Sequence, residues 1–118
     1  MDVKFTIAGV RNAQGKVRGL AFVASGRKGF PESRMMAVAE AETQAKVGEV
    51  ELVFKNVPEE ASFSFFHDEK ETGKIEKNFL GIPKSGVGAS NWAGRGRPSF
   101  EKCLVRVTPK AQVRLHYF

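Results

Sequence analysis

The stretch that decides the fold is ASFSFFHD, residues 61–68. Two sets of side chains alternate along it: Ala61, Phe63, Phe65 and His67 against Ser62, Ser64, Phe66 and Asp68. Because successive side chains of a β-strand point to opposite faces of a sheet, this rhythm predicts a strand. Phe has no polar atom that needs a partner, so we expect most of the chain's ten Phe rings in a hydrophobic core.

The same rhythm recurs on both sides of this stretch. Apolar and polar residues alternate over residues 3–7, 50–54, 103–107 and 113–117, and residues 17–24 form an apolar run broken by Arg18 and Gly19. The pattern predicts one all-β domain over residues 1–118, an antiparallel two-sheet sandwich of about seven strands. No alternation of strands with long helices supports a parallel α/β sheet.

Two connecting regions are less regular. Residues 26–29, Gly-Arg-Lys-Gly, predict a turn, and Phe30-Pro31 predicts an extended bend. Within residues 31–46, Ala, Glu and Met favour a helix by propensity, whereas residues 38–45 alternate as a strand does. We expect a short helical turn near residues 33–36, followed by an edge strand.

Residues 68–100 lack a sustained periodicity and contain six glycines. Loops longer than roughly 12–15 residues in compact domains are usually functional or disordered. This one also contains apolar side chains: Phe79, Leu80, Ile82, Val87 and Trp92. We therefore expect one long ordered Gly-rich loop that folds onto the sandwich.

Charge is concentrated in the last third of the chain. Residues 1–76 carry 11 basic and 12 acidic groups, whereas residues 77–118 carry eight basic groups and one acid, Glu101. A basic region attracts nucleic acid, anionic lipid or an acidic partner, or is simply a solvated surface.

The single cysteine, Cys103, cannot form an internal disulfide and is expected as a small buried residue on a strand. No apolar run approaches the ~20 residues that span a bilayer, and the N-terminus has no signal-peptide pattern.

The long loop carries a family resemblance. Its runs Phe65-Phe66-His67-Asp68-Glu69, Asn78-Phe79-Leu80-Gly81-Ile82-Pro83-Lys84, Gly86-Val87-Gly88-Ala89-Ser90-Asn91 and Pro98-Ser99-Phe100-Glu101 resemble the bacterial domain-of-unknown-function family numbered 2141. The resemblance implies a small immunoglobulin-like or transthyretin-like sandwich, secreted or periplasmic after removal of a signal peptide. It implies no established activity.

Relatives in that family often have an Asp- and Asn-rich loop after the His that is similar to a calcium loop. Here Asp68 and Gly73 remain, and the other oxygen donors would be Thr72, Glu76 and Asn78. Lys70 stands where an oxygen ligand is expected. Since an ammonium repels a divalent cation, calcium binding by this degraded loop is only an alternative hypothesis.

His67-Asp68-Glu69 is the sharpest cluster of titratable groups. It could serve acid–base chemistry, which would need an open pocket around His67. We favour a structural role in which His67 at a strand end holds the long loop. No Gly-x-Ser-x-Gly elbow, metal-spaced His pair or phosphate-binding loop is present, so we expect no enzyme and no cofactor.

Trp92, Arg95 and Arg97 place an aromatic ring beside two guanidinium groups, a combination found in single-strand nucleic-acid binders. The motif is short and unspecific, and Trp92 could instead pin the loop while Arg95 or Arg97 pairs with Asp68 or Glu69. Nucleic acid is therefore a less favoured partner.

Our leading hypothesis is a non-enzymatic extracytoplasmic binding or structural module, a monomer or weak homodimer. Its candidate surface is the 67–100 loop, with an unknown ligand or protein partner of anionic character. The residues expected to bind ligand or organise the loop are His67, Asp68, Asn78, Lys84, Asn91, Trp92 and Arg95. A purely structural module would instead expose an apolar patch or a free strand edge, for example at residues 113–118.

Overall fold

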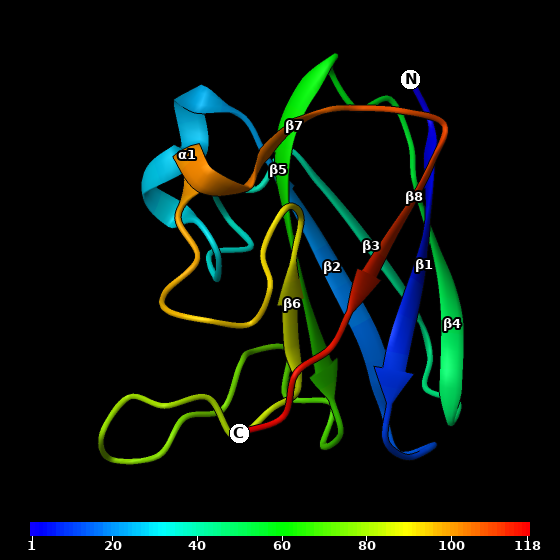
Figure 1. Ribbon diagram of the computed structural model, residues 1–118, viewed down its shortest axis with the longest axis vertical. Coiled ribbons are helices and arrows are strands. Elements are labelled where there is room, and N and C mark those ends of the chain that lie inside the picture. Colours follow the sequence, from blue (N-terminus) through cyan, green and yellow to red (C-terminus); the bar gives the residue numbers. More distant parts are fainter.

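The longest strand of the computed structural model, which describes residues 1–118, is β5 (Glu60–Asp68), and it contains the alternating stretch. Figure 1 shows it within the larger of two facing sheets. This larger sheet has the order β3-β2-β5-β6, and β7 pairs with the beginning of β5. Its other strands are β2 (Lys16–Phe22), β3 (Ala39–Gln44), β6 (Val87–Ala89) and β7 (Leu104–Arg106). The predicted all-β sandwich is confirmed, with eight strands.

The smaller sheet has the order β4-β1-β8, formed by β4 (Gly48–Phe54), β1 (Val3–Val10) and β8 (Lys110–Arg114). Every strand pair in the two sheets is antiparallel except β1 and β8, which run parallel. The parallel pair was not predicted, because side-chain alternation is the same in either strand direction.

Four Phe rings from three strands fill the space between the sheets. Phe5 of β1 packs against Phe63 and Phe65 of β5 with ring centroids 4.7 and 4.8 Å apart, and Phe54 of β4 lies 5.2 Å from Phe63. Gly19 of β2 faces these rings, and a Cβ atom there would lie 2.7 Å from Phe54. The glycine that interrupts the apolar run thus makes room for the aromatic core.

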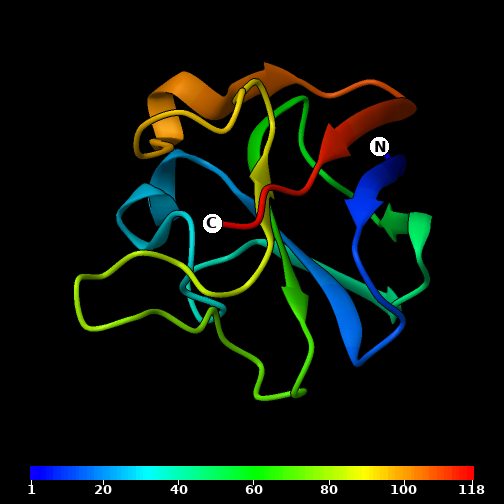
Figure 2. The same ribbon diagram turned by 60° about the horizontal axis from the view of Figure 1, so that its bottom comes forward.

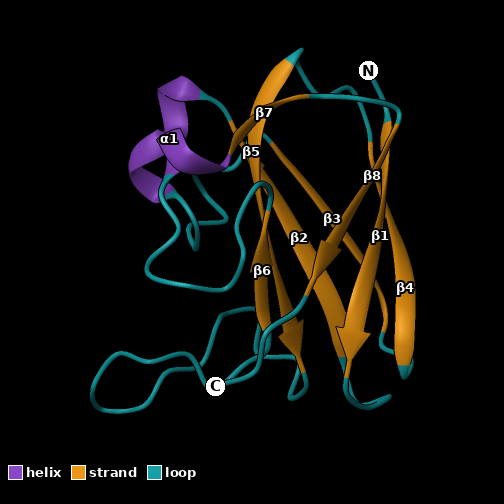
Figure 3. Cartoon of the chain, viewed as in Figure 1, coloured by secondary structure: helices purple, strands orange, loops and turns teal.

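The outer face of β5 is also covered. The 3₁₀ helix η1 (Ala24–Gly29), the segment after it and the short helix α1 (Phe100–Cys103) lie over this face, and Figure 3 shows both helices on one side of the sandwich. Ser62 Oγ donates to the Phe100 carbonyl and Ser64 Oγ to that of Pro31, each at 2.6 Å. The serines that alternate with Phe therefore hold the covering segments.

The covering segments differ in detail from the predictions. Residues 26–29 lie in a 3₁₀ helix where a turn was expected, and residues 34–36 form a turn without a helix. The edge strand was predicted correctly as β3. The Phe30–Pro31 peptide bond is cis. Cys103 is buried as expected, but it ends α1 instead of lying on a strand, because Ser99 caps that helix through Lys102 N.

The chain after β8 crosses from the smaller sheet to the larger one. His116 and Val87 exchange backbone hydrogen bonds of 2.8 and 2.9 Å, so residue 116 of the expected 113–118 edge is paired. β8 itself remains the outer strand of the smaller sheet. Val113 and Leu115 are buried beneath this crossing. Neither helix has the length and apolar character needed to span a lipid bilayer.

The long loop divides into two parts that behave differently. Residues 85–90 are buried and contain β6, whereas residues 69–84 extend away from the sandwich, as Figures 1 and 2 both show. Phe79 is 95% exposed and Leu80 is 69% exposed. The expectation that all the apolar side chains of the loop fold onto the sandwich is wrong for its tip, which the backbone carries outward.

Candidate functional site

β5 ends in a buried carboxylate that anchors the loop. Asp68 Oδ2 accepts hydrogen bonds from Arg18 Nε at 2.7 Å and from Gly73 N at 2.8 Å, and Oδ1 accepts one from Thr72 N at 2.9 Å. Burial alone would raise the pKa of Asp68, but these hydrogen bonds outweigh it and hold the pKa below its usual value. Asp68 is therefore a charged anchor for the first turn of the loop.

His67 is fully buried beside this anchor. Its Nε2 lies 2.7 Å from the Gln14 carbonyl oxygen, and its Nδ1 lies 2.8 Å from Tyr117 Oη. Because a carbonyl oxygen only accepts, Nε2 must carry a hydrogen. Tyr117 Oη accepts a further hydrogen bond from Arg11 N, so its own hydrogen can point at Nδ1. Both ring nitrogens thus have partners in the chain, and the His67 side chain holds the β1–β2 turn and the C-terminal segment. The long loop, which we expected it to hold, is reached only by its backbone N–H, which donates to the Gly86 carbonyl at 2.8 Å.

The neighbouring Glu69 pairs with Arg11, whose Nη2 lies 2.7 Å from Oε1. The hydrogen bond from Arg11 holds the pKa of Glu69 below its usual value, against the effect of burial. The acids of the cluster therefore bind arginines of the first two strands and their turn. The expected pairing of Arg95 or Arg97 with Asp68 or Glu69 is wrong.

The residues of the calcium hypothesis do not form a common oxygen cage. Asp68 is bonded to Arg18, Glu76 Oε2 lies 3.7 Å from Lys70 Nζ, and Asn78 bonds within the loop tip. No three His, Cys, Asp or Glu side chains are grouped so that they could hold a metal ion. Two cationic side chains, Arg18 and Lys70, lie beside the carboxylates of Asp68 and Glu76.

Asn91, Trp92 and Arg95 belong to one turn near the C-terminal segment. Asn91 Nδ2 donates to the Lys102 carbonyl and Trp92 Nε1 to the Arg95 carbonyl, each at 3.0 Å. The Trp92 ring packs edge-on against His116 with centroids 5.5 Å apart, and His116 is half-buried. Trp92 therefore pins this turn, while one side of its ring remains available.

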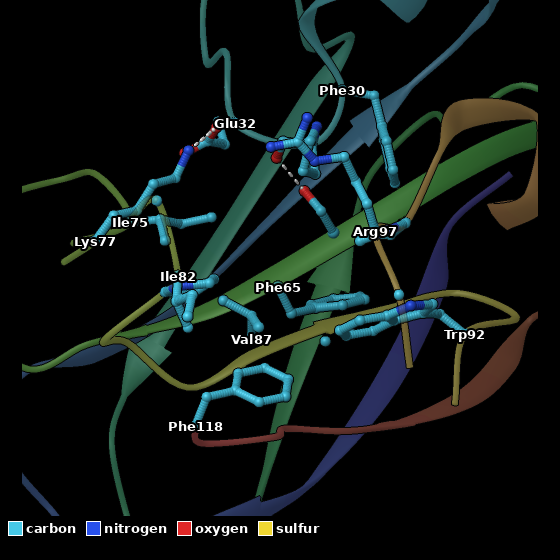
Figure 4. Close-up of a pocket in the computed structure, with 17 residues that line it drawn as sticks. Phe30, Glu32, Phe65, Ile75, Lys77, Ile82, Val87, Trp92, Arg97 and Phe118 are labelled. Atoms are coloured by element: carbon cyan, nitrogen blue, oxygen red, sulfur yellow. Dashed lines mark hydrogen bonds and ion pairs between the residues drawn. The ribbon is translucent and has the colours of Figure 1, made fainter. Parts of the chain in front are cut away.

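That side of Trp92 faces a cavity of about 430 Å³ on the outer flank of the larger sheet. In Figure 4, Ile82 and Lys77 of the loop lie on one side, Phe30 and Arg97 lie with Trp92 on the other, and Val87 of β6 lies between them. We call this cavity the flank pocket. Its apolar lining residues are Phe30, Phe65, Ile75, Ile82, Val87, Trp92 and Phe118.

Charged groups stand at the rim of the flank pocket. Lys77 Nζ lies 2.6 Å from Glu32 Oε2, and this ion pair joins the loop to the segment after η1. Arg97 is exposed and has no carboxylate within ion-pair distance. The pocket thus combines an aromatic lining with one guanidinium whose charge is not neutralised by the chain.

The seven predicted site residues fall into three places. His67 and Asp68 lie at the end of β5, with Lys84 beside the same shallow polar hollow as Asp68. Asn78 lies alone in the loop tip, and Asn91, Trp92 and Arg95 share the turn described above. Of the seven, only Trp92 lines the flank pocket.

The predicted 67–100 loop supplies much of the pocket lining, but the seven residues predicted as site residues leave out all of it except Trp92. Phe30 and Phe118, outside the loop, were not predicted. Two signals pointed to the pocket. The Phe30-Pro31 bend was visible in the sequence, and residues 77–100 contain four basic residues and no acid to neutralise them. No local pattern showed that the Phe30-Pro31 bend and residues 77–100 come together around β6.

Searches of curated proteins and of solved structures find no match to the chain. A family model does match, over residues 5–114, from within β1 to the end of β8. The match therefore covers both sheets, the end of β5 and the loop around the flank pocket. The chain belongs to the bacterial family described as "Uncharacterized protein conserved in bacteria (DUF2141)", as the loop motifs predicted.

Proposed function

We propose that this chain is a non-enzymatic extracytoplasmic binding module whose flank pocket takes a small ligand with an apolar body and an anionic group. One observation carries the proposal: an aromatic-lined cavity of about 430 Å³ whose rim holds the unpaired guanidinium of Arg97. The pocket is formed largely by the 67–100 loop, the surface expected from the sequence.

The size and lining of the pocket support a small ligand. Small-molecule sites are typically concave, roughly 300–1,000 Å³ in volume, and mostly apolar with a few polar groups. The Trp92 ring is fixed by its Nε1 hydrogen bond and by His116, so binding against it costs little ordering of the side chain. Phe118 and Ile82, 64% and 45% exposed, would bury apolar surface against a ligand.

The charge at the rim supports an anion. The Lys77–Glu32 pair is internally neutral, so Arg97 dominates the local field. A guanidinium offers several donors in a planar fork that matches carboxylate, sulfate or phosphate oxygens. The ligand class that fits is thus an amphipathic anion. We favour it over nucleic acid because a single unpaired guanidinium offers no repeating track for a phosphate backbone.

A non-enzymatic role is proposed from the state of the titratable groups. His67 and Asp68, the strongest candidates for acid–base chemistry, are buried and bonded to their own chain. The flank pocket is lined by one carboxylate, Glu32, which is paired with Lys77. The extracytoplasmic location is proposed from family resemblance, and fractionation of cells expressing the complete native reading frame would test it.

The binding test uses two probes that share one aromatic body. Anilinonaphthalene sulfonate carries a sulfonate, and phenylnaphthylamine is its neutral parent. Trp92 is the only tryptophan, so quenching of its fluorescence reports binding at this pocket. We expect the sulfonate to bind about tenfold more tightly than the neutral parent, since a charge-assisted hydrogen bond contributes about 1.5 kcal/mol or more.

Matched variants assign this preference to one residue. Arg97→Gln should abolish the preference for the sulfonate, whereas Arg95→Gln, two positions away and outside the pocket lining, should keep it. Equal quenching by both probes in the unmodified chain, or an unchanged preference in Arg97→Gln, would refute the proposal.

A further inference from the structure

The tip of the long loop presents apolar side chains to solvent. Phe79 is 95% exposed, Leu80 69% and Ile82 45%, and all three lie within four consecutive residues. Scattered exposed apolar residues are normal, but a contiguous group marks an interaction site. Trp92, by contrast, is half-buried in the same loop, so the exposure belongs to the tip.

Hydrogen bonds within the loop hold its backbone in a shape that keeps Phe79, Leu80 and Ile82 exposed. Asn78 Oδ1 accepts hydrogen bonds from Leu80 N at 2.9 Å and Ile82 N at 3.1 Å, and Asn78 N donates to the Ile82 carbonyl at 2.9 Å. Lys84 N donates to the Glu76 carbonyl at 2.7 Å, which closes the base of a hairpin over residues 76–84. Figure 1 shows this hairpin projecting from the sandwich. The role of the predicted residue Asn78 is to shape this tip.

Two lysines without an ion-pair partner lie near the base of the hairpin. Lys84 ends the hairpin and Lys74 precedes it, and neither lies within ion-pair distance of a carboxylate. Lys77 is neutralised by Glu32, and the acid of the hairpin, Glu76, is neutralised by Lys70. A narrow apolar projection with a cationic base matches the interface of an anionic bilayer, where apolar side chains enter between lipids and lysines stay at the headgroups.

We propose that the 76–84 hairpin docks this protein on an anionic lipid surface, with Phe79 and Leu80 inserted and Lys84 and Lys74 at the headgroups. A bilayer fits this tip better than a protein partner does, because three side chains on a convex hairpin offer too little area for a stable protein interface, whereas lipid adapts to any shape. The inference does not depend on a ligand in the flank pocket.

Co-sedimentation with vesicles tests the docking. The unmodified chain should bind vesicles of equal parts phosphatidylglycerol and phosphatidylcholine, bind pure phosphatidylcholine weakly, and lose affinity as salt rises. The double substitution Phe79→Ser with Leu80→Ser should lower the affinity for the anionic vesicles about tenfold or more, by removing the inserted apolar surface. Lys84→Gln should lower it about fivefold, the effect of one cation near such a surface.

Matched controls separate insertion from general stickiness and from misfolding. Met35→Ser removes an equally bare apolar side chain, 97% exposed, and Lys110→Gln removes a cation on β8; both should bind like the unmodified chain. A urea midpoint shows that the double variant is folded. The proposal is overturned if the unmodified chain ignores anionic vesicles, if the double variant binds them as well as the original, or if the tip substitutions instead dissociate a dimer in sedimentation equilibrium.

Discussion

The end of β5 and the flank pocket beside it use the same kind of residue in opposite ways. Arg18 is 14% exposed at its side chain and lies 2.7 Å from a carboxylate that is itself buried. Arg97 is exposed at the rim of a cavity, with no carboxylate within ion-pair distance. Likewise the hydroxyl of Tyr117 is bound to His67, whereas the neighbouring Phe118, which lines the pocket, is 64% exposed.

This difference separates residues that hold the fold from residues that are available to a partner. A buried polar network in which every member is bonded rigidifies the structure, and it becomes costly when one member is lost. An unpaired charge or bare ring contributes little to folding, so its removal should affect binding alone. The titratable cluster that looked most functional in the sequence therefore belongs to the fold.

The largest effect should come from breaking the Asp68 anchor. Asp68→Asn removes the buried counter-charge of Arg18, which keeps only the more exposed Glu42 at 3.4 Å. It also places an amide beside the N–H groups of Thr72 and Gly73. We expect the free energy of unfolding to fall by about 3 kcal/mol, as for other broken buried ion pairs. Urea titration followed by circular dichroism measures this loss.

An exposed ion pair provides the matched control for that anchor. Glu40 pairs with Arg34 at the same 2.7 Å distance, but both side chains are nearly half exposed. Glu40→Gln should cost less than about 1 kcal/mol. If the two substitutions cost the same, the Asp68 network is not the anchor that its geometry indicates.

The same anchor should make stability depend on acid pH. The pKa of Asp68 is lower in the folded protein than its ordinary value of 3.8, because hydrogen bonds from Arg18 and the loop outweigh burial. A lowered pKa means that the stabilisation is complete above the unfolded value and is lost as pH falls through the folded one. Urea midpoints measured from neutral pH downward should therefore fall below about pH 4. The fall should be smaller in Asp68→Asn; an equally steep fall there would assign the dependence to other acids, such as Glu69.

The fold could be predicted from the sequence because strand alternation is a local pattern. Residues 61–68 and the edge strand of residues 39–44 depend only on which side chains recur at every second position. The short helices were missed because tertiary packing outweighs propensity in short segments. Phe30 and Ala37, in the segment after η1, pack with Phe100 of α1 against Leu20 and Phe22, which no pattern within either helix reveals.

The partners of the β5 cluster were predicted wrongly for a related reason. Arg18 lies opposite Phe66, two residues before Asp68, so its side chain is on the same face and diagonal to that carboxylate. This register is set between segments that are 50 residues apart. The one available signal was a charged residue within an apolar run, which indicates a buried partner but does not name it.

The smallest effect on stability should come from the pocket, and one substitution made at two sites sharpens the contrast. Arg97→Gln should change the free energy of unfolding by less than about 0.5 kcal/mol, because an exposed arginine without an ion pair contributes little. Arg18→Gln should cost about 2 kcal/mol or more, because it leaves the Asp68 carboxylate buried without its cation. Urea titration of both variants, beside the probe titrations of Arg97→Gln, gives the complete comparison. An equal cost at both positions would mean that Arg97 has a structural partner and is not free for a ligand, whereas unequal costs leave its charge available to an anion at the pocket rim.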